Sequence, residues 1–342
     1  MVKIAVIGMG NIGHAFLEVL DSKRDFLKQN CNFEFSVVGI ADLKLGLLEN
    51  PEGLDLSQLL KEYTFKGHLN DIATPMKKED SIPFIENSLA DILVEITPTN
   101  IKTAQPALTH VKTALENGIH VVTCNKGPAA LEYQILKQLA DKNNVQFRIE
   151  GTVMVGTPVI NLTQQNLAGN KIHSIHGILN GTTNYMLSLM EKGKTYAQAL
   201  EKAQKLGYAE TDPTADVEGH DALAKVAILA NVLLNANLKI EDIACEGITK
   251  MTPEKIQGAL KEGQRWKLLG EIVNTDDGVI AKVEPQKVSL AHPLAQVMGP
   301  TNAVTIDTDL MGEITVVGAG AGRSEAAFAL LNDIIQIHRG AY

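Results

Sequence analysis

The 342-residue chain has little of several residue types, and each shortage argues against a class of protein. Its three cysteines, Cys31, Cys124 and Cys245, are odd in number and far apart. This pattern fits neither a disulfide framework nor a zinc site, and it favours a reducing cytoplasm. A single tryptophan and only 4% aromatic residues leave little material for an aromatic binding platform.

Long basic and long apolar runs are also missing. No basic cluster is longer than two residues, two acids directly follow Lys77-Lys78, and the formal net charge is −9. Nucleic-acid surfaces, by contrast, are usually rich in lysine and arginine. No run approaches the roughly 18 apolar residues of a membrane helix, and the N-terminus lacks the parts of a signal peptide. We therefore expect no nucleic-acid or membrane partner, and a small-molecule ligand instead.

The first half of the chain alternates strand and helix signals. Such alternation predicts an α/β domain with a parallel sheet and helices on both faces. The polar, turn-rich stretch 43–88 is interpreted as an excursion at the edge of that sheet. The expected strands are 2–7, 35–41, 91–96, 119–123 and 145–149, and the expected helices are 12–28, 102–117 and 128–142.

After about residue 150 the regular alternation stops. The pattern there predicts an α+β region with a mixed or antiparallel sheet, and the length predicts two domains at about 150 residues each. We expect domains at 1–130 and 131–317, with 318–342 packing back on the first. The expected strands are 171–179, 264–274, 278–285, 301–307 and 313–318, and the expected helices are 183–191, 195–206, 217–236 and 324–338.

A glycine-rich turn, Gly8-Met9-Gly10-Asn11-Ile12-Gly13, lies between the first expected strand and helix. In this position it is the fingerprint of a Rossmann-like dinucleotide-binding domain. Gly8 allows the tight turn, Gly10 lets the backbone approach a pyrophosphate, and Gly13 lets the helix pack closely on the strand. The alternative is a purely structural turn.

Asp42 ends the second expected strand, where an acid would bond the ribose hydroxyls of NAD and disfavour the 2′-phosphate of NADP. Lys44 follows closely and could instead attract that phosphate. The sequence thus favours NAD and leaves NADP open. The alternative for Asp42 is a cap or turn residue.

Two further strand ends lie at the same expected sheet edge. Thr97-Pro98-Thr99 follows one strand, and Asn125-Lys126 follows the next. Ligands of open α/β sheets bind outside the carboxyl ends of the strands, so these residues are candidates for the nicotinamide half of a cofactor. The alternative for Lys126 is an exposed charge before a helix.

The most unusual segment is 207–221, which holds five acids within twelve residues and runs into an apolar helix. Asp221 and Lys225 are four residues apart, so they share one helical face. The acids could bind the ammonium group of a ligand while the lysine interacts with an oxygen atom of the same ligand. The alternative is a surface salt bridge.

Together these segments resemble the homoserine dehydrogenase family. The matching residues are the glycine turn, VVTCNK (121–126), GILNGTTNYML (177–187) and GYAETDPTADVEGHDALAK (207–225), and the likeness extends to GAGAGRSEAAFALLNDI (318–334). The segment 207–225 is the specific part. The resemblance implies a nucleotide-binding domain followed by a catalytic and dimerisation region, in the short form without an appended regulatory domain.

The resemblance also implies an activity, the NAD(P)-dependent interconversion of L-homoserine and L-aspartate 4-semialdehyde by a homodimer. This step feeds threonine, methionine and isoleucine synthesis. The nicotinamide carries the hydride, and a lysine moves the proton of the substrate oxygen.

Roles follow by motif from the same resemblance. Lys225 and Lys126 would be the acid/base and substrate-oxygen lysines, with Asp221 beside Lys225. The implied substrate-binding residues are Glu210, Asp216, Asn180, Gly181 and Thr182. The implied cofactor-binding residues are Gly8, Gly10, Asn11, Ile12, Gly13, Asp42, Thr97, Pro98, Thr99, Asn125, Lys126 and Gly320. Some members hold a structural sodium or potassium ion, and the matching positions are Glu150, Val153, Val155 and Thr157.

Two departures from the family pattern bear on these roles. The usual Glu-Pro-Asp-Pro reads Glu210-Thr211-Asp212-Pro213, and the usual Gly-Gly-Ile-Pro of the cation loop reads Val155-Gly156-Thr157-Pro158. Two other functions stay open. One is a related dehydrogenase of another small amino-acid aldehyde, and the other is a non-catalytic NAD-binding sensor.

Overall fold

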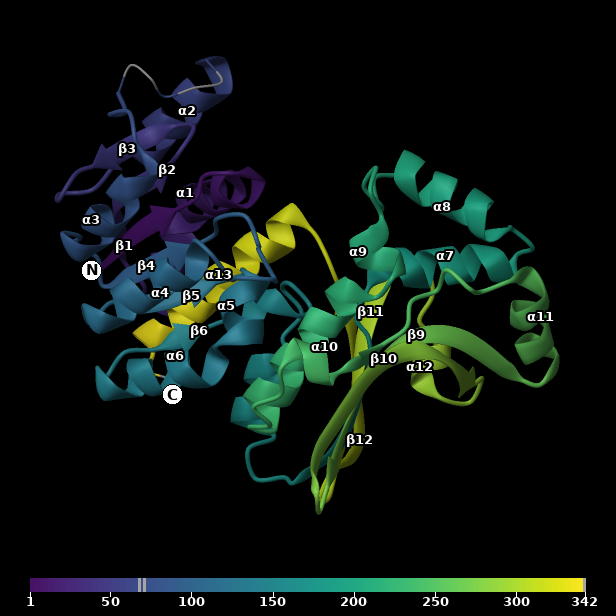
Figure 1. Ribbon diagram of the computed structural model, residues 1–342. Coiled ribbons are helices and arrows are strands. Elements are labelled where there is room, and N and C mark those ends of the chain that lie inside the picture. Colours follow the sequence, from purple (N-terminus) through teal and green to yellow (C-terminus); the bar gives the residue numbers. More distant parts are fainter. Residues whose placement is uncertain (67–68, 70–71, 341–342) are drawn as a thin grey trace. The chain divides into compact units, whose positions relative to one another are not determined.

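The computed structural model describes residues 1–66, 69 and 72–340 and divides the chain into two compact units (Figure 1). The first is Met1–Thr152 with Gly322–Tyr342, and the second is Val153–Ala321. The first unit thus ends at Thr152 rather than at 130, because helix α6 (Tyr133–Lys142) and strand β6 (Phe147–Arg148) complete its sheet. The chain returns to it at Gly322 rather than at 318, because strand β12 (Gly312–Ala319) belongs to the second sheet.

The first unit is built on a six-stranded sheet in the order β3-β2-β1-β4-β5-β6. Strands β1 (Val2–Ile7), β2 (Phe35–Asp42), β4 (Ile92–Glu95), β5 (His120–Thr123) and β6 are parallel, as the alternating pattern predicts. The edge strand β3 (Gly46–Glu49) runs antiparallel to β2. The edge excursion 43–88 also holds α2 (Leu56–Lys66) and α3 (Ser81–Glu86); residues 67–68 and 70–71 of it, like 341–342, lie outside the described residues.

Helix α13 (Arg323–His338) packs against α1 (Asn11–Cys31). Its apolar side chains Leu330 and Ile334 join Phe16 and Leu20 of α1 and Val94 of β4 in one buried core. Burial of such side chains is the main stabilising contribution to packing. The last helix therefore belongs to the first unit.

Two expected helices of this unit differ from their predictions. The helix expected at 102–117 begins only at Ala107, as α4 (Ala107–Glu116), because Pro106 disfavours helical backbone at the residue before it. The helix expected at 128–142 is divided at Glu132, whose φ of −137° leaves the helical region, into α5 (Lys126–Leu131) and α6.

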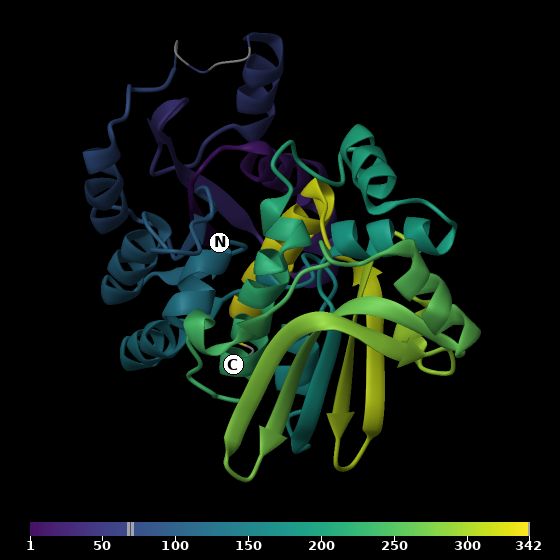
Figure 2. The same ribbon diagram turned by 45° about the vertical axis from the view of Figure 1, so that its right-hand side comes forward.

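The second unit is built on a mixed sheet in the order β12-β11-β7-β9-β10-β8, shown in Figure 2. Its long strands β7 (Ile172–Ile178), β9 (Gln264–Thr275), β10 (Gly278–Ser289), β11 (Thr301–Thr308) and β12 pair antiparallel, and the short β8 (Ala244–Cys245) pairs parallel with β10. The predicted α+β class is confirmed.

The helices of the second unit are α7 (Gly181–Glu191), α8 (Tyr196–Lys205), α9 (Thr214–Val217), α10 (His220–Leu233), α11 (Pro253–Lys261) and α12 (Pro293–Gln296). The helix expected at 217–236 is instead α9 and α10, separated by Gly219 at a φ of +86°. Glycine adopts this left-handed backbone without strain. Helix α11 was not expected. None of the helices in the described ranges is long and apolar enough to cross a membrane.

Candidate active site

The glycine-rich turn joins β1 to α1, and its three glycines differ in what surrounds them. A Cβ on Gly8, whose φ is +99°, would lie 2.6 Å from the Ile96 carbonyl oxygen, and one on Gly13 would lie 2.6 Å from that of Gly8. A Cβ on Gly10 would have no described atom within 4 Å. Gly8 and Gly13 are therefore required by packing, while Gly10, followed by Asn11 and Ile12, leaves free space at the N-terminus of α1. A helix N-terminus is the kind of place where a phosphate can bind.

Asp42 ties this turn to the end of β2. Its Oδ2 accepts from the Met9 N–H at 2.8 Å, and its Oδ1 accepts from the N–H groups of Lys44 and Leu45 at 2.8 and 3.1 Å. The carboxylate thus serves as the turn residue that was the alternative interpretation. An ionised carboxylate has further acceptor capacity, so these bonds leave room for a ribose hydroxyl.

The ends of β4 and β5 meet, as the sequence predicts. The Asn125 amide donates to the Thr97 carbonyl at 3.0 Å, and its Oδ1 accepts from the Gly127 N–H at 3.1 Å, capping α5. Lys126 is the first residue of α5 and is half-buried, whereas Pro98 and Thr99 are exposed. Asn125 therefore holds the strand end and the start of the lysine-bearing helix together.

Glu95, which was not predicted from the sequence, holds the ends of β4 and β5 together through hydrogen bonds to Thr97 and Thr123. Its carboxylate is fully buried and accepts from the Thr97 N–H at 3.1 Å and from the Thr97 hydroxyl. The Thr123 hydroxyl donates to the Glu95 carbonyl at 2.6 Å and accepts from the Asn125 N–H at 2.9 Å. His110 Nδ1 lies 3.6 Å from the Glu95 carboxylate. A lone acid inside an apolar strand is the signal that could have revealed it.

Cys124, between Thr123 and Asn125, is not a nucleophile of this site. Burial, assisted by Glu95, raises the pKa of its thiol to about 12, and Lys126 opposes this only in part. A cysteine reacts as its thiolate, so the side chain is inert near neutral pH.

The acidic segment and α10 form a second cluster, in the second unit. The Lys225 ammonium lies 2.8 Å from Asp221 Oδ2 and donates to the Leu179 carbonyl at 2.7 Å. The Asn180 amide donates to Asp216 Oδ1 at 2.6 Å and to Asp221 Oδ2 at 3.1 Å. The Lys225 side chain is only 7% exposed. The pair is therefore not the surface salt bridge of the alternative interpretation.

Asp216 lies at the partly desolvated end of this cluster. Burial is the main cause that raises the pKa of its carboxyl, and the nearby charge of Asp221 acts in the same direction. The hydrogen bond from Asn180 and the charge of Lys225 lower it. A buried lysine beside two carboxylates is the kind of arrangement found at sites of proton transfer.

The remaining predicted substrate residues differ in whether they lie beside this cluster or are exposed. Gly181 begins α7, and the Thr182 hydroxyl donates to the Tyr208 carbonyl at 2.7 Å. Glu210 is exposed, and its carboxylate makes no ion pair with any described residue. The structure therefore brings Asn180, Asp216, Asp221 and Lys225 together through an ion pair and hydrogen bonds. The exposed Glu210 side chain makes no such contact with them.

The predicted cation positions fall on both sides of the division between the units. Glu150 belongs to the first unit, and Val153, Val155 and Thr157 to the second. Val155 has a φ of +50°, a strained backbone for a β-branched residue. The Thr157 hydroxyl donates to the Ala319 carbonyl at 3.3 Å, one residue before Gly320. No cluster of three or more acidic, histidine or cysteine ligands occurs within the described ranges.

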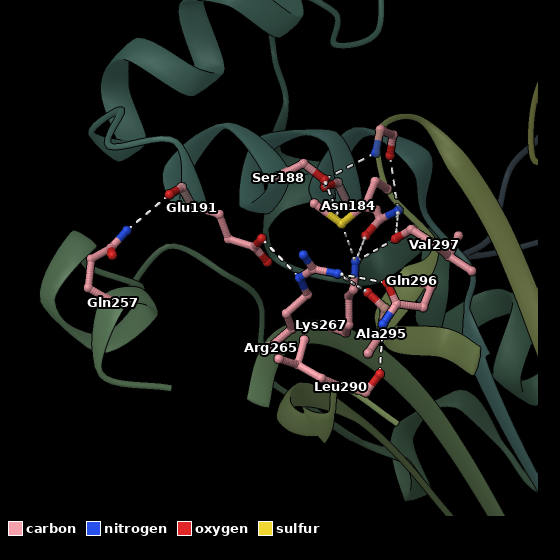
Figure 3. A network of polar contacts seen from close by, with 12 residues as sticks. Asn184, Ser188, Glu191, Gln257, Arg265, Lys267, Leu290, Ala295, Gln296 and Val297 are labelled. Carbon is pink, nitrogen blue, oxygen red and sulfur yellow. Dashed lines mark hydrogen bonds and ion pairs between the residues drawn. The ribbon is translucent and has the colours of Figure 1, made fainter. Parts of the chain in front are cut away.

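A buried lysine, also missed by sequence analysis, supports α7 (Figure 3). Lys267 of β9 donates to Asn184 Oδ1 at 2.9 Å and to the Val297 carbonyl at 2.5 Å, and it is 1% exposed. The Asn184 amide donates in turn to the carbonyls of Val297, Gly299 and Thr301. These bonds attach the first turns of α7 to the segment 297–301.

Comparisons with known proteins cover both parts of the chain. The model of the homoserine dehydrogenase family matches residues 158–335, and that of the NAD-binding domain of homoserine dehydrogenase matches residues 8–150. The chain is 46% identical to an NAD(+)-dependent homoserine dehydrogenase from Pseudomonas canavaninivorans, over 99% of this chain and 97% of that one.

Two further relatives are similar over nearly their whole length. One is a homoserine dehydrogenase from Methanocaldococcus jannaschii, 44% identical over 98% of each chain. The other is the structure of a hyperthermophilic archaeal homoserine dehydrogenase mutant in complex with NADPH, with a TM-score of 0.85 and 29% identity over 100% of this chain and 98% of that one. The chain therefore belongs to the homoserine dehydrogenase family of NAD(P)-dependent oxidoreductases that act on a CH–OH group.

Proposed function

We propose that this protein interconverts L-homoserine and L-aspartate 4-semialdehyde and that Lys225 is its proton-transferring group. The observation that carries the proposal is the buried Lys225–Asp221 pair beside Asn180 and Asp216. When bound, the nicotinamide accepts or returns the hydride. The neutral amine of Lys225 accepts the proton of the substrate hydroxyl in oxidation, and the ammonium so formed returns it to the developing alkoxide in reduction. Asp221 holds the lysine in position.

The other predicted residues have supporting roles in this proposal. Lys126, held at the start of α5, binds the substrate oxygen, and Asp216 and Glu210 take the substrate ammonium. Asn180 orients both aspartates through its amide, and Gly181 and Thr182 form the wall of the substrate site at α7. The cofactor-binding residues are Gly8, Gly10, Asn11, Ile12, Gly13, Asp42, Thr97, Pro98, Thr99, Asn125, Lys126 and Gly320.

NAD is the proposed cofactor, with NADP as the alternative. Asp42 supports NAD because its carboxylate would repel a 2′-phosphate. One similar protein is named NAD(+)-dependent, whereas another similar structure holds NADPH. Oxidation of L-homoserine, followed by nicotinamide absorbance, should show a higher kcat/KM with NAD than with NADP. Faster oxidation of another small amino-acid alcohol would favour the related-dehydrogenase alternative, which the exposed Glu210 side chain keeps open.

Replacing Gly10 with alanine should weaken cofactor binding without disturbing the fold. The added methyl meets no described atom, and the Gly10 φ of −76° suits alanine. A pyrophosphate at this helix N-terminus would, however, collide with it. We expect the Kd of NAD from fluorescence titration to rise at least about tenfold, roughly 1.4 kcal/mol, at an unchanged melting temperature. Gly258→Ala in α11, at a residue also without a described neighbour within 4 Å and without a left-handed φ, serves as a remote control. An unchanged Kd in Gly10→Ala would contradict the cofactor site.

A structural sodium or potassium ion at Glu150, Val153, Val155 and Thr157 is a further proposal. The left-handed backbone of Val155 supports it, because such strain is concentrated at ligand sites. Main-chain carbonyls of such a loop would suit a hard monovalent cation. Exchanging the metal ion for choline at constant ionic strength should lower the melting temperature, since a ligand of the folded state stabilises it. Equal melting temperatures in sodium, potassium and choline would contradict the site.

We also propose the biological setting that the family resemblance implies. The reaction supplies threonine, methionine and isoleucine synthesis in the cytoplasm, and the working unit is a homodimer with the first unit binding the cofactor. The three widely spaced cysteines support a reducing compartment. Sedimentation equilibrium at assay concentrations tests the homodimer.

A further inference from the structure

Asn302, the second residue of β11, is a buried amide without partners. It is 0% exposed, and neither its Nδ2 nor its Oδ1 finds a hydrogen-bond partner among the described residues. Buried polar side chains in folded proteins are nearly always paired, and an unpaired one has lost its water without compensation. Such a group therefore requires an explanation at this position.

The amide is packed between two glycines that belong to the proposed site. A Cβ on Gly320 would lie 2.2 Å from Asn302 Cγ, and a Cβ on Gly181 would lie 3.4 Å from Asn302 Oδ1. Gly181 follows Asn180, whose amide bonds Asp216 and Asp221. Asn302 thus contacts the first residue of α7 at the edge of the Lys225 cluster.

The backbone that leads to Asn302 is held firmly, so the missing bonds do not come from a loose segment. Asn184 donates to the carbonyls of Val297, Gly299 and Thr301, and Lys267 also donates to that of Val297, as Figure 3 shows in part. The Pro300 carbonyl packs so closely on α7 that a Cβ on Gly181 would lie 2.5 Å from its oxygen. This frame fixes the amide against α7 with both of its polar atoms unused.

We propose that Asn302 is a positioning residue of the substrate site, whose amide gains its hydrogen bonds in the complex with the amino-acid substrate. The inference rests on the proposed function. The substrate class is a small α-amino acid with a terminal alcohol or aldehyde. Because Asn302 is 0% exposed, ordered water held between the substrate at the α7 N-terminus and the amide supplies these hydrogen bonds. Part of the free energy of substrate binding is then the pairing of Asn302.

The test replaces Asn302 with leucine, which has a similar shape and no polar atom. Removing an unpaired amide is expected to leave the urea midpoint of the ligand-free protein unchanged or higher, because no hydrogen bond is lost. The KM for L-homoserine should rise about tenfold, as loss of one or two hydrogen bonds predicts, while the Kd of NAD measured without substrate stays the same. A residue with a purely structural role would not combine these effects.

Asn231→Leu is the matched control. Asn231 is also a buried amide, but it donates to the Leu238 carbonyl at 2.9 Å and accepts from the Leu238 N–H at 2.7 Å. Its replacement should lower the urea midpoint and leave the KM unchanged. Asn302→Ala is a second variant, should leucine prevent folding, with the same expected rise in KM.

The outcomes are separable. An unchanged KM in both Asn302 variants, or a fall in the urea midpoint of Asn302→Leu like that of Asn231→Leu, would overturn the proposal. Homoserine oxidation by the unaltered protein tests the proposed function, whereas the ratio of variant to unaltered KM tests Asn302. If another amino-acid alcohol proves to be the substrate, the same ratio is measured with it.

Discussion

Lys225→Met is expected to lower kcat for homoserine oxidation by roughly 10²–10⁴-fold, the range for loss of a positioned acid/base group. Methionine retains the long apolar stem that packs in the buried site of Lys225. The substitution removes the group that bonds Leu179 and Asp221, at 2.7 and 2.8 Å. Turnover under saturating substrate and fluorescence titration of NAD together measure the effect, and the Kd of NAD should not change.

Loss of the lysine also removes the ammonium that faces the largely buried Asp221 carboxylate, and breaking a buried ion pair by removing one partner destabilises a protein. The double variant Lys225→Met/Asp221→Asn should therefore recover stability but not turnover. Lys250→Met is the control, because Lys250 pairs with Glu246 at the same i,i+4 spacing but is 77% exposed. Exposed pairs contribute little. Near-normal turnover in Lys225→Met would show that another group moves the proton.

The elements that the sequence predicted well are those whose signal is local. The five parallel strands follow from short β-branched runs, and the glycine turn follows from its spacing after β1. What failed depends on single residues or on packing. Glu132 divides a helix that its periodicity predicts as continuous, and Gly219 divides α9 from α10. The antiparallel β3 pairs with β2, and no local pattern announces that pairing.

The candidate site divides in the same way. The spacing of Asp221 and Lys225 predicts a common helical face, but the burial of the pair depends on Leu179, 46 residues earlier. Glu95 and Lys267 owe their importance to partners distant in sequence, such as Thr123 and Val297. Such partners cannot be found without the fold, because long-range contacts leave no periodic signal in a single sequence. Glu210 is the opposite case, because the segment that contains it matches the family motif strongly but its side chain is exposed.

Lys267 is expected to make the stability of the protein rise between about pH 8 and pH 10. Burial lowers the pKa of Lys267 from 10.5 to about 8, against the attraction of Glu191, and Arg265 adds to the lowering. The folded protein thus releases this proton at lower pH than the unfolded chain does. Wherever the unfolded state binds more protons, stability increases with pH, by up to about 1 kcal/mol per pH unit for one group.

The hydrogen bonds of Lys267 do not oppose this trend. A neutral amine still has two donors, and Lys267 uses two on oxygen, to Asn184 and Val297. Deprotonation therefore removes the desolvated charge and keeps the attachment of α7 to the segment 297–301. Proton loss should accordingly leave the first turns of α7, and with them Asn180 and Gly181, in place.

The measurement compares unaltered protein with Lys267→Met in urea at pH 7, 8, 9 and 10. Other groups titrate in this range, so the informative quantity is the difference in unfolding free energy between the two proteins. The unfolding free energy of the unaltered protein minus that of Lys267→Met should rise by roughly 2 kcal/mol between pH 8 and pH 10. Whatever methionine does to packing adds a constant at every pH and does not affect the slope.

Lys282→Met is the control, because the pKa of Lys282 is shifted in the opposite direction to that of Lys267. Its hydrogen bond to Glu284 raises the pKa of Lys282 above 10.5, burial opposes this, and the nearby charge of Glu271 adds to the rise. The stability that this lysine contributes is fully present below the pKa of the unfolded chain and is lost only above it. The difference in unfolding free energy between Lys282→Met and the unaltered protein should therefore stay constant from pH 8 to pH 10. If the Lys267→Met difference is equally flat, Lys267 keeps its proton in the folded state, and Asn184 is then held by a permanently buried ammonium.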